Sequence, residues 1–188
     1  MHILEAPRGY PVSLQDAKQQ CAILDDTHDS LLLGYISAAT ASVEKDIGAL
    51  LFTQKVGFTL SGFPDAEIEI PVYPVQSVDL VEYIDPEGAT VQMDALTDYW
   101  QSLQGRHPFI CPVNGWPATQ SGNPGAVTVE VTVGFPHVSK IPSDIRQAIL
   151  IRVKELYSHR GESFVGGPVS QVQLTVEALL SRHRRLST

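Results

Sequence analysis

The sequence predicts an α+β protein in which a helical frame is interrupted by an insertion of antiparallel strands. Three observations lead to this class. Apolar residues recur at helical spacing up to about residue 47, alternate with polar residues from about 51 to 133, and return to helical spacing at Pro142. The chain has 188 residues, a length that suits one domain carrying a sizeable insertion.

Local signals support each expected helix. Ser13 is a favourable N-cap, and Asp16 stands three residues later, although a capping box usually has Glu or Gln there. Gly48 is a suitable C-cap for the second helix, and Pro142 suits the first turn of the third. The second helix has one apolar stripe, formed by Leu32, Ile36, Ala39, Val43 and Ile47. The helices are expected at about 14–23, 29–47, 142–160 and 175–185.

The insertion is expected to hold about six or seven short antiparallel strands, enough for a small barrel or sandwich. Its clearest strand is 127–133, where valine alternates strictly with polar residues. The predicted organisation is a helical domain, a β insertion domain, and a flexible linker with a C-terminal arm. These parts correspond to residues 1–50 with 136–161, residues 51–135, and residues 162–188.

Composition narrows the functional classes. No apolar run approaches the roughly 20 residues that span a bilayer, and the N-terminus lacks the features of a signal peptide, so a cytoplasmic product is expected. Cys21 and Cys111 are far apart and form no CxxC, which favours two small buried thiols over a disulfide. The net charge of -8 argues against a nucleic-acid-binding surface, although Arg182, Arg184 and Arg185 make the end of the chain basic.

Candidate chemical sites are weak, and we expect no catalytic residue, cofactor or metal. A metal cluster at Asp25, Asp26, His28 and Asp29 is less favoured than helix capping. His107 and Cys111 lack a second pair of zinc ligands. His137, Ser139, Ser143 and Asp144 are close only in sequence. An undetected hydrolase stays an alternative, and it would require a pocket with groups of perturbed pKa.

Two further features each allow two interpretations. Tyr83, Tyr99, Trp100 and Trp116 could line the groove of a carbohydrate- or small-ligand-binding β module, but aromatic residues in a small barrel more often fill its interior. The short segment near the C-terminus could be a helix docked on its own domain. It could instead be an arm that places Leu179 and Leu180 in another subunit's groove while its arginines meet acids.

The order and spacing of several short motifs resemble those of the tailed-phage head–tail connector proteins, in the group whose long β insertion separates the second and third helices. The resemblance covers nearly all of residues 7–160, and the segment 176–182 also looks like the family's ending. The motifs are Pro11-Val12-Ser13-Leu14 with Ala17-Lys18, Phe52-Thr53-Gln54, Gly62-Phe63-Pro64, Pro74-Val75-Gln76-Ser77-Val78, Tyr83-Ile84-Asp85, and Ile145-Arg146-Gln147-Ala148-Ile149 with Leu156-Tyr157. The loop 114–124 departs from the pattern.

The resemblance implies a structural head-completion adaptor in the neck of a virion or phage-like particle. It implies a ring of twelve copies beneath the portal protein, a docking surface for the tail or a stopper protein, and a C-terminal arm that engages the portal. Matched by position, that role would fall to Leu179, Leu180, Arg182 and Arg185. DNA would pass without specific binding, because negative walls do not attract phosphates.

Overall fold

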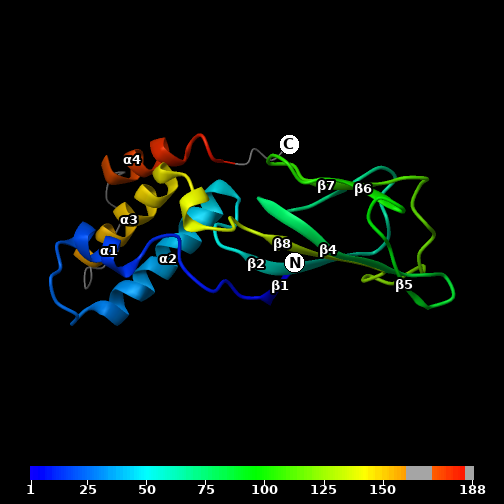
Figure 1. Ribbon diagram of the computed structural model, residues 1–188, viewed down its shortest axis with the longest axis horizontal. Helices are drawn as coiled ribbons and strands as arrows, with labels where there is room; N and C mark the ends of the chain where they lie inside the picture. The colour runs from blue at the N-terminus through cyan, green and yellow to red at the C-terminus, as the bar shows by residue number, and fades with distance from the viewer. Residues whose placement is uncertain (160–170, 185–188) are drawn as a thin grey trace. The chain divides into compact units, whose positions relative to one another are not determined.

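The structure of the chain, a computed structural model, describes residues 1–159 and 171–184, with backbone alone at 171 and 172. It divides into two compact units (Figure 1). The β unit comprises Met1–Arg8 and Phe52–Pro136, and the helical unit comprises Gly9–Leu51 and His137–Thr188. The predicted α+β class is confirmed. The first eight residues, which the sequence placed with the helices, lie in the β unit.

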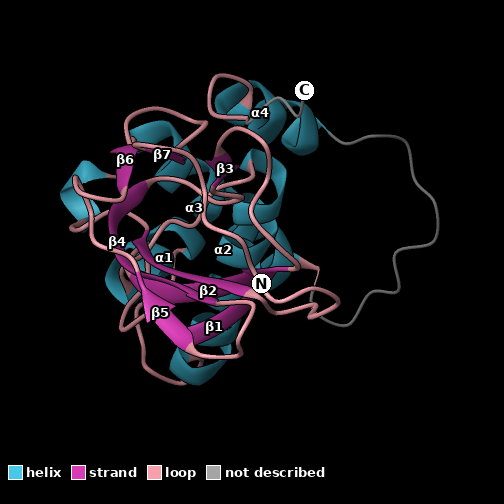
Figure 2. Cartoon of the chain, turned by 90° about the vertical axis from the view of Figure 1, so that its right-hand side faces the viewer, coloured by secondary structure: helices cyan, strands magenta, loops and turns pink. Residues whose placement is uncertain are grey.

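The β unit contains two antiparallel sheets. The larger has the strand order β1-β2-β8-β4-β5 and the smaller the order β3-β7-β6. Figure 2 labels β1, β2, β4 and β5 of the larger sheet and all three strands of the smaller. The strands are β1 (His2–Glu5), β2 (Gln54–Leu60), β3 (Ile68–Glu69), β4 (Val75–Ile84), β5 (Thr90–Gln92), β6 (Tyr99–Ser102), β7 (Phe109–Pro112) and β8 (Val127–Val133). The strand β1, which was not predicted, pairs with β2 at one edge of the larger sheet.

Strand β8 is the centre of the larger sheet, because it pairs with β2 on one side and β4 on the other. Its four valines are buried and the residues between them are half-buried, as strict alternation predicts. On the half-buried face, the ammonium of Lys55 on β2 lies 2.7 Å from the carboxylate of Glu130 on β8. The apolar face of β8 therefore forms the core of the β unit.

The insertion begins and ends at one place in the β unit. Phe52 and Phe135 form an isolated bridge, and the Thr53 hydroxyl donates to the carbonyl of Phe135 at 3.0 Å. The side-chain amide of Gln76 donates to the Thr53 hydroxyl oxygen at 2.9 Å and to the Gly134 carbonyl at 2.8 Å. Entry and exit are thus joined by hydrogen bonds.

The helical unit is built around α3. Its helices are α1 (Leu14–Cys21), α2 (Asp29–Ile47), α3 (Ser143–Ser158) and α4 (Gln171–Leu180), with a short 3-10 turn at Val138–Lys140. α3 packs against each of the other three helices. Among the described residues, no helix combines the length and hydropathy needed to cross a membrane.

The helix ends follow their capping chemistry. Ser13 and Asp16 form a reciprocal capping box, in which each side chain accepts the other residue's backbone N–H. α1 ends two residues earlier than predicted because Ala22 adopts a left-handed conformation. α2 has the predicted bounds and ends at left-handed Gly48, and its predicted apolar stripe is buried.

Glu44 has a half-buried carboxyl, and folding disfavours its charged form. Its Oε1 accepts the backbone N–H of Leu51 at 2.7 Å. Burial raises the pKa of Glu44, and the hydrogen bond from Leu51 offsets this only in part. A carboxyl with a raised pKa binds its proton more tightly in the folded state. Its contribution to stability is therefore present at low pH and lost as the pH rises through the folded pKa.

We expect Glu44→Gln to raise the free energy of unfolding at neutral pH, because glutamine keeps the acceptor oxygen and removes the buried charge. The gain over the wild type should shrink as the pH falls to about 4, because the raised pKa lets the wild-type carboxyl take up its proton before that pH is reached. Urea unfolding of both proteins at the two pH values measures the difference. Glu87→Gln, on an exposed turn, is the matched control. An equal gain at both pH values would contradict the prediction.

Candidate functional site

The C-terminal helix α4 is docked on its own unit. Val176 is 2% exposed and Leu180 is 0% exposed, and α4 packs mainly against α3. Leu174 points outward and is 56% exposed. Of the two interpretations that the sequence left open for this segment, the structure has the docked helix.

The four residues predicted to bind the portal have different environments. Leu179 is half-buried and Arg182 is exposed, so both have surface to offer. Leu180 differs from the expectation: its side chain lies in the core of the helical unit, where no partner reaches it while α4 is docked. Arg185 lies outside the described residues. A portal contact by Leu179 or Arg182 stays a prediction.

A contact between a histidine and an aspartate fixes the end of α4. Nε2 of His183 lies 2.6 Å from Oδ2 of Asp144, in the first turn of α3. Burial acts to raise the pKa of Asp144, but the hydrogen bond and charge of His183 outweigh it and hold that pKa below its usual value. The pair joins the C-terminal end of α4 to the N-terminal end of α3. Sequence reasoning missed it, because the two residues are 39 positions apart.

An open groove of about 660 Å³ lies between α2, α3 and α4. Leu156 and Val176 give it apolar surface, and Glu155 and Glu177 give it acidic groups. The guanidinium of Arg152 donates to the Ser42 hydroxyl at 2.6 Å and pairs with Asp46, so it holds α3 to α2. The lining residues are Ala38, Ala39, Ser42, Arg152, Glu155, Leu156, His159, Gln173, Val176 and Glu177.

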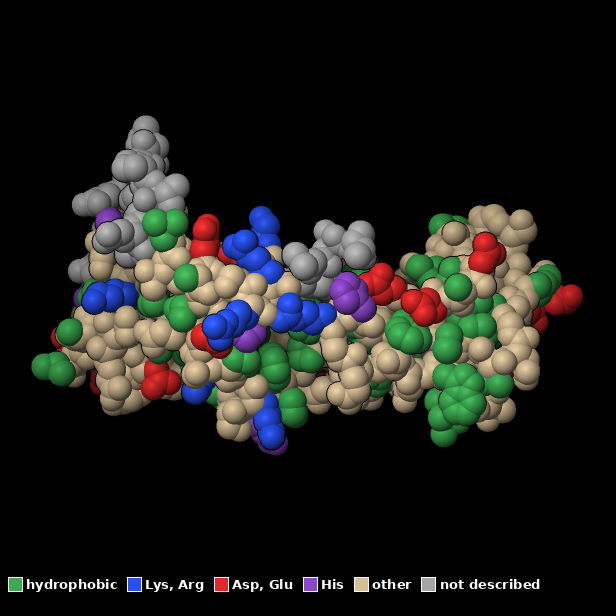
Figure 3. All heavy atoms as spheres, turned by 90° about the horizontal axis from the view of Figure 1, so that it is seen from above, with side chains coloured by type: hydrophobic (Ala, Val, Ile, Leu, Met, Phe, Trp, Pro, Cys, Tyr) green, Lys and Arg blue, Asp and Glu red, His purple; other side chains and the backbone are tan. Residues whose placement is uncertain are grey.

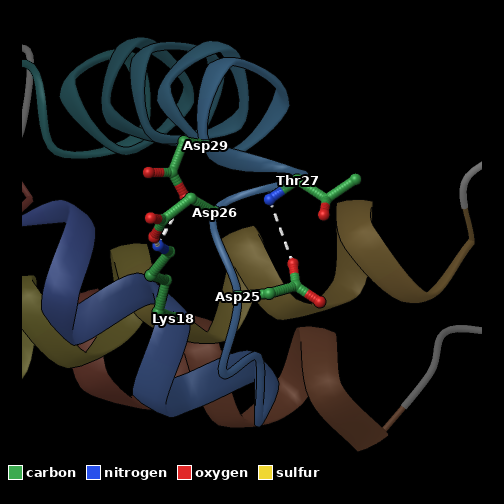
Figure 4. A network of polar contacts seen from close by, with 5 residues as sticks. All are labelled: Lys18, Asp25, Asp26, Thr27 and Asp29. Atoms are coloured by element: carbon green, nitrogen blue, oxygen red, sulfur yellow. Dashed lines mark hydrogen bonds and ion pairs between the residues drawn. The ribbon is translucent and has the colours of Figure 1, made fainter.

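A lysine side chain pairs with the acidic cluster before α2. Nζ of Lys18 lies 2.5 Å from the carboxylate of Asp26 and 2.6 Å from that of Asp29 (Figure 4). Asp25 instead accepts the backbone N–H of Thr27 at 3.0 Å, as in a capping turn. The hydrogen bond to Asp26, followed by that to Asp29, raises the pKa of Lys18. Two of the residues suspected as metal ligands, Asp26 and Asp29, therefore fasten α1 to the start of α2.

Two of the other candidate chemical residues, His107 and Asp144, also have structural partners. Nδ1 of His107 lies 3.2 Å from a Glu69 carboxylate oxygen. Asp144 pairs with His183, a different histidine from the one its sequence neighbourhood suggested. Within residues 1–159 and 173–184, no three His, Cys, Asp or Glu side chains form a group that could hold a metal ion.

The four aromatic residues suggested for a ligand groove have separate roles. Trp116 stacks on Phe63 with ring centroids 4.5 Å apart, and its indole N–H donates to the Ala66 carbonyl at 2.7 Å. The rings of Tyr83 and Phe63 meet edge to face, with their centroids 5.6 Å apart. Tyr99 is buried, whereas Trp100 is half-exposed. Trp100 therefore stands apart as the one of the four with a large free surface.

One family model matches part of the chain. Residues 11–87 match the family model described as phage gp6-like head-tail connector protein. The matched stretch runs from the capping box of α1 to the turn between β4 and β5. The resemblance inferred from the sequence motifs is thereby confirmed over residues 11–87. No curated protein matches the chain in sequence.

Solved structures of particle necks match the whole fold. One is the neck of an empty GTA particle computed with C6 symmetry, with a TM-score of 0.78 and 20% identity. It is covered to 96% and this chain to 100%. A second match, in the virion of a native gene transfer agent particle, has a TM-score of 0.77 and 21% identity, with the same coverage of both chains. A third match, in the neck of a native GTA particle computed with C12 symmetry, has a TM-score of 0.68 and 22% identity. It covers 100% of this chain and 97% of that one. At these identities the likeness establishes the fold.

Proposed function

We propose that this chain works as one copy of a ring in the neck of a tailed phage or phage-like particle. Its residues 11–87 match the head–tail connector model, and its fold matches that of a neck structure. The ring sits under the portal, has twelve copies, and offers the docking surface for the tail or a stopper. The observation that carries the proposal is the agreement of the family match with a fold likeness that covers the entire chain, to neck structures computed with C6 and C12 symmetry. The role is structural and involves no catalysis.

A ring requires two different complementary faces on each copy, because head-to-tail contacts close under cyclic symmetry. The test is native mass spectrometry of the purified chain alone and with the portal protein that the same particle contains. A twelve-copy species that forms on the portal supports the proposal. A chain that remains monomeric at every portal concentration, and is missing from purified particles, would overturn it.

The contact with the portal is assigned to the exposed end of α4. Removing residues 171–188 would test this poorly, because it would also strip Val176 and Leu180 from the core and destabilise the helical unit. Substitutions at the exposed positions avoid this problem. Leu179 and Arg182 are the described members of the predicted set that keep surface while α4 is docked.

We expect Arg182→Glu combined with Leu179→Ser to weaken portal binding by roughly tenfold or more, because the variant loses an apolar contact and reverses a charge at the interface. Its melting temperature should stay near that of the wild type. Arg8→Glu is the matched control, because Arg8 is an arginine of the other unit with a 90% exposed side chain. Surface plasmon resonance with immobilised portal gives the affinities. Equal binding by both variants would remove α4 from the portal contact.

Passage of DNA without specific binding is supported by the distribution of charge. The net charge of the whole chain is -8, and phosphate binding depends on clustered Lys and Arg. An assembled ring whose bore is lined by Lys and Arg would contradict this part of the proposal.

A further inference from the structure

The segment 94–100 of the β unit exposes a leucine in an unusual backbone conformation. Leu96 has φ 71°, in the left-handed region that a leucine rarely adopts, and it is 65% exposed. Hydrogen bonds hold the backbone there: the N–H of Leu96 donates to the Tyr99 carbonyl at 2.8 Å, and that of Asp98 to the Asp94 carbonyl at 2.9 Å. A side-chain oxygen of Asp98 accepts the Asp94 N–H at 2.8 Å. Strain of this kind persists where the surroundings enforce it, and it often marks a working surface.

The same segment exposes a tryptophan on an edge strand. Met93 and Tyr99 are buried and anchor the segment from inside, whereas Trp100 is 52% exposed. Trp100 lies on β6 opposite Cys111 of β7, and β6 pairs with no other described strand. A large apolar side chain on a fixed backbone loses little freedom when a partner covers it, and tryptophan is enriched at the centres of interfaces.

The β unit that contains this segment is acidic and carries the entire net charge of the chain, and the segment itself holds Asp94 and Asp98. The β unit contains eleven Asp and Glu against three Lys and Arg, a net charge of -8, whereas the helical unit has ten of each. The acidic residues are Glu5, Asp65, Glu67, Glu69, Asp79, Glu82, Asp85, Glu87, Asp94, Asp98 and Glu130. In Figure 3, the part of the β unit at the right shows hydrophobic and acidic side chains and no coloured Lys or Arg.

We propose that segment 94–100 docks a basic protein component of the same particle, with Leu96 and Trp100 entering apolar recesses that Lys and Arg surround. The inference rests on the proposed connector function and names the chemistry of the component that attaches to the ring. Opposite charge accelerates the encounter and excludes wrong partners, while the two apolar side chains supply the contact that persists.

Charge favours a basic protein at this segment over a nucleic acid or a second copy of the chain. A nucleic acid would be repelled by the carboxylates of the β unit. A β unit of a second copy would bring a further -8 to the contact. In a ring, the acidic β units of all copies repel one another, so a basic partner that covers them also lowers the electrostatic energy of the assembly.

The test uses the particle itself. In cells that produce it, the gene for this chain is replaced by the variants Leu96→Gly and Trp100→Ala, and by Asp94→Asn. Purified heads and tailed particles are counted by electron microscopy, and the amount of connector per head is measured by mass spectrometry. Ile3→Ser and Glu87→Gln are the matched controls, since they alter an exposed isoleucine and an exposed acid of the same unit.

We expect Leu96→Gly and Trp100→Ala each to reduce tailed particles at least about tenfold, with the wild-type amount of connector on the heads. Asp94→Asn should slow attachment of tails to isolated heads, and added salt should slow attachment for the wild type too. The controls should assemble normally. Glycine accepts φ 71° without strain, so Leu96→Gly should melt no lower than the wild type, which separates lost docking from lost folding.

The outcomes are distinguishable. Wild-type numbers of tailed particles from Leu96→Gly and Trp100→Ala would overturn the docking surface and leave the connector function intact. Heads that lack these variants, although the variants are folded, would also overturn it, because segment 94–100 would then serve the ring or the portal. Absence of the wild-type chain from every particle would overturn the connector function itself.

Discussion

Gly134→Ala is expected to destabilise the β unit by roughly 3 kcal/mol or more, an exceptional cost for adding one methyl group. Gly134 has φ 92°, and a Cβ there would lie 2.2 Å from the carbonyl oxygen of Phe52 and 2.8 Å from the nitrogen of Thr53. These are backbone atoms, and the bridge between Phe52 and Phe135 prevents them from withdrawing. Urea unfolding followed by circular dichroism measures the loss.

Gly122→Ala separates the close approach from backbone strain. Gly122 also has a positive φ, 76°, but a Cβ there would meet nothing within 4 Å. Its cost should be about 1 kcal/mol, that of a left-handed residue with a side chain. If both variants lose the same stability, the contact between Gly134 and Phe52 does not constrain the fold.

Leu180→Ala is expected to lower the free energy of unfolding by about 2–5 kcal/mol, the usual range for emptying a buried leucine site. Leu180 is 0% exposed and stands in the sequence between the body of α4 and His183, which contacts Asp144. Its loss should release α4 before the rest of the helical unit unfolds. Hydrogen exchange at the amides of α4 detects that release, and thermal melting gives the overall loss.

Leu174→Ala is the matched control on the same helix, because Leu174 is 56% exposed. A surface substitution of this kind should change stability by no more than about 0.5 kcal/mol. Equal losses at the two leucines would show that α4 is not docked as the structure has it.

The first three helices of the helical unit were largely predictable because their signals are local, whereas α4 spans Gln171–Leu180 and not the predicted 175–185. The stripe from Leu32 to Ile47 has the period of a helix, and Gly48 supplies the left-handed end that closes it. The end of α1 was not predictable in the same way. Ala22 adopts a left-handed conformation without being glycine or asparagine, so nothing in its type announced the turn.

The β unit was predictable in its strands and less so in its pairing. The alternating valines of β8 mark a half-buried strand wherever it pairs. Its partners, β2 and β4, are chosen by side-chain packing between distant segments, which alternation does not encode. β1 escaped prediction because all four of its residues are exposed and show no alternation.

The residues of the candidate site also divide into those that local patterns predict and those that depend on contacts between distant segments. Arg182 and Leu179 could be proposed because a family motif and an amphipathic pattern mark them. Burial of Leu180 depends on α4 meeting α3. The contact of His183 with Asp144 joins two residues that are 39 positions apart in the sequence. The exposed Leu96 left no trace in the sequence, because its left-handed conformation is enforced by the carbonyl of Tyr99 and the carboxylate of Asp98.

The bridge between Phe52 and Phe135 has a consequence for how such proteins diversify. A segment whose two ends meet can be exchanged for another without stretching the chain that receives it. Recombination between related genes could therefore replace residues 52–136 as a cassette. The exchange has one condition: Met1–Arg8 contributes an edge strand to the same sheet, so a foreign cassette must either accept this strand or arrive with its own. The start of the gene and its middle are then expected to be inherited together.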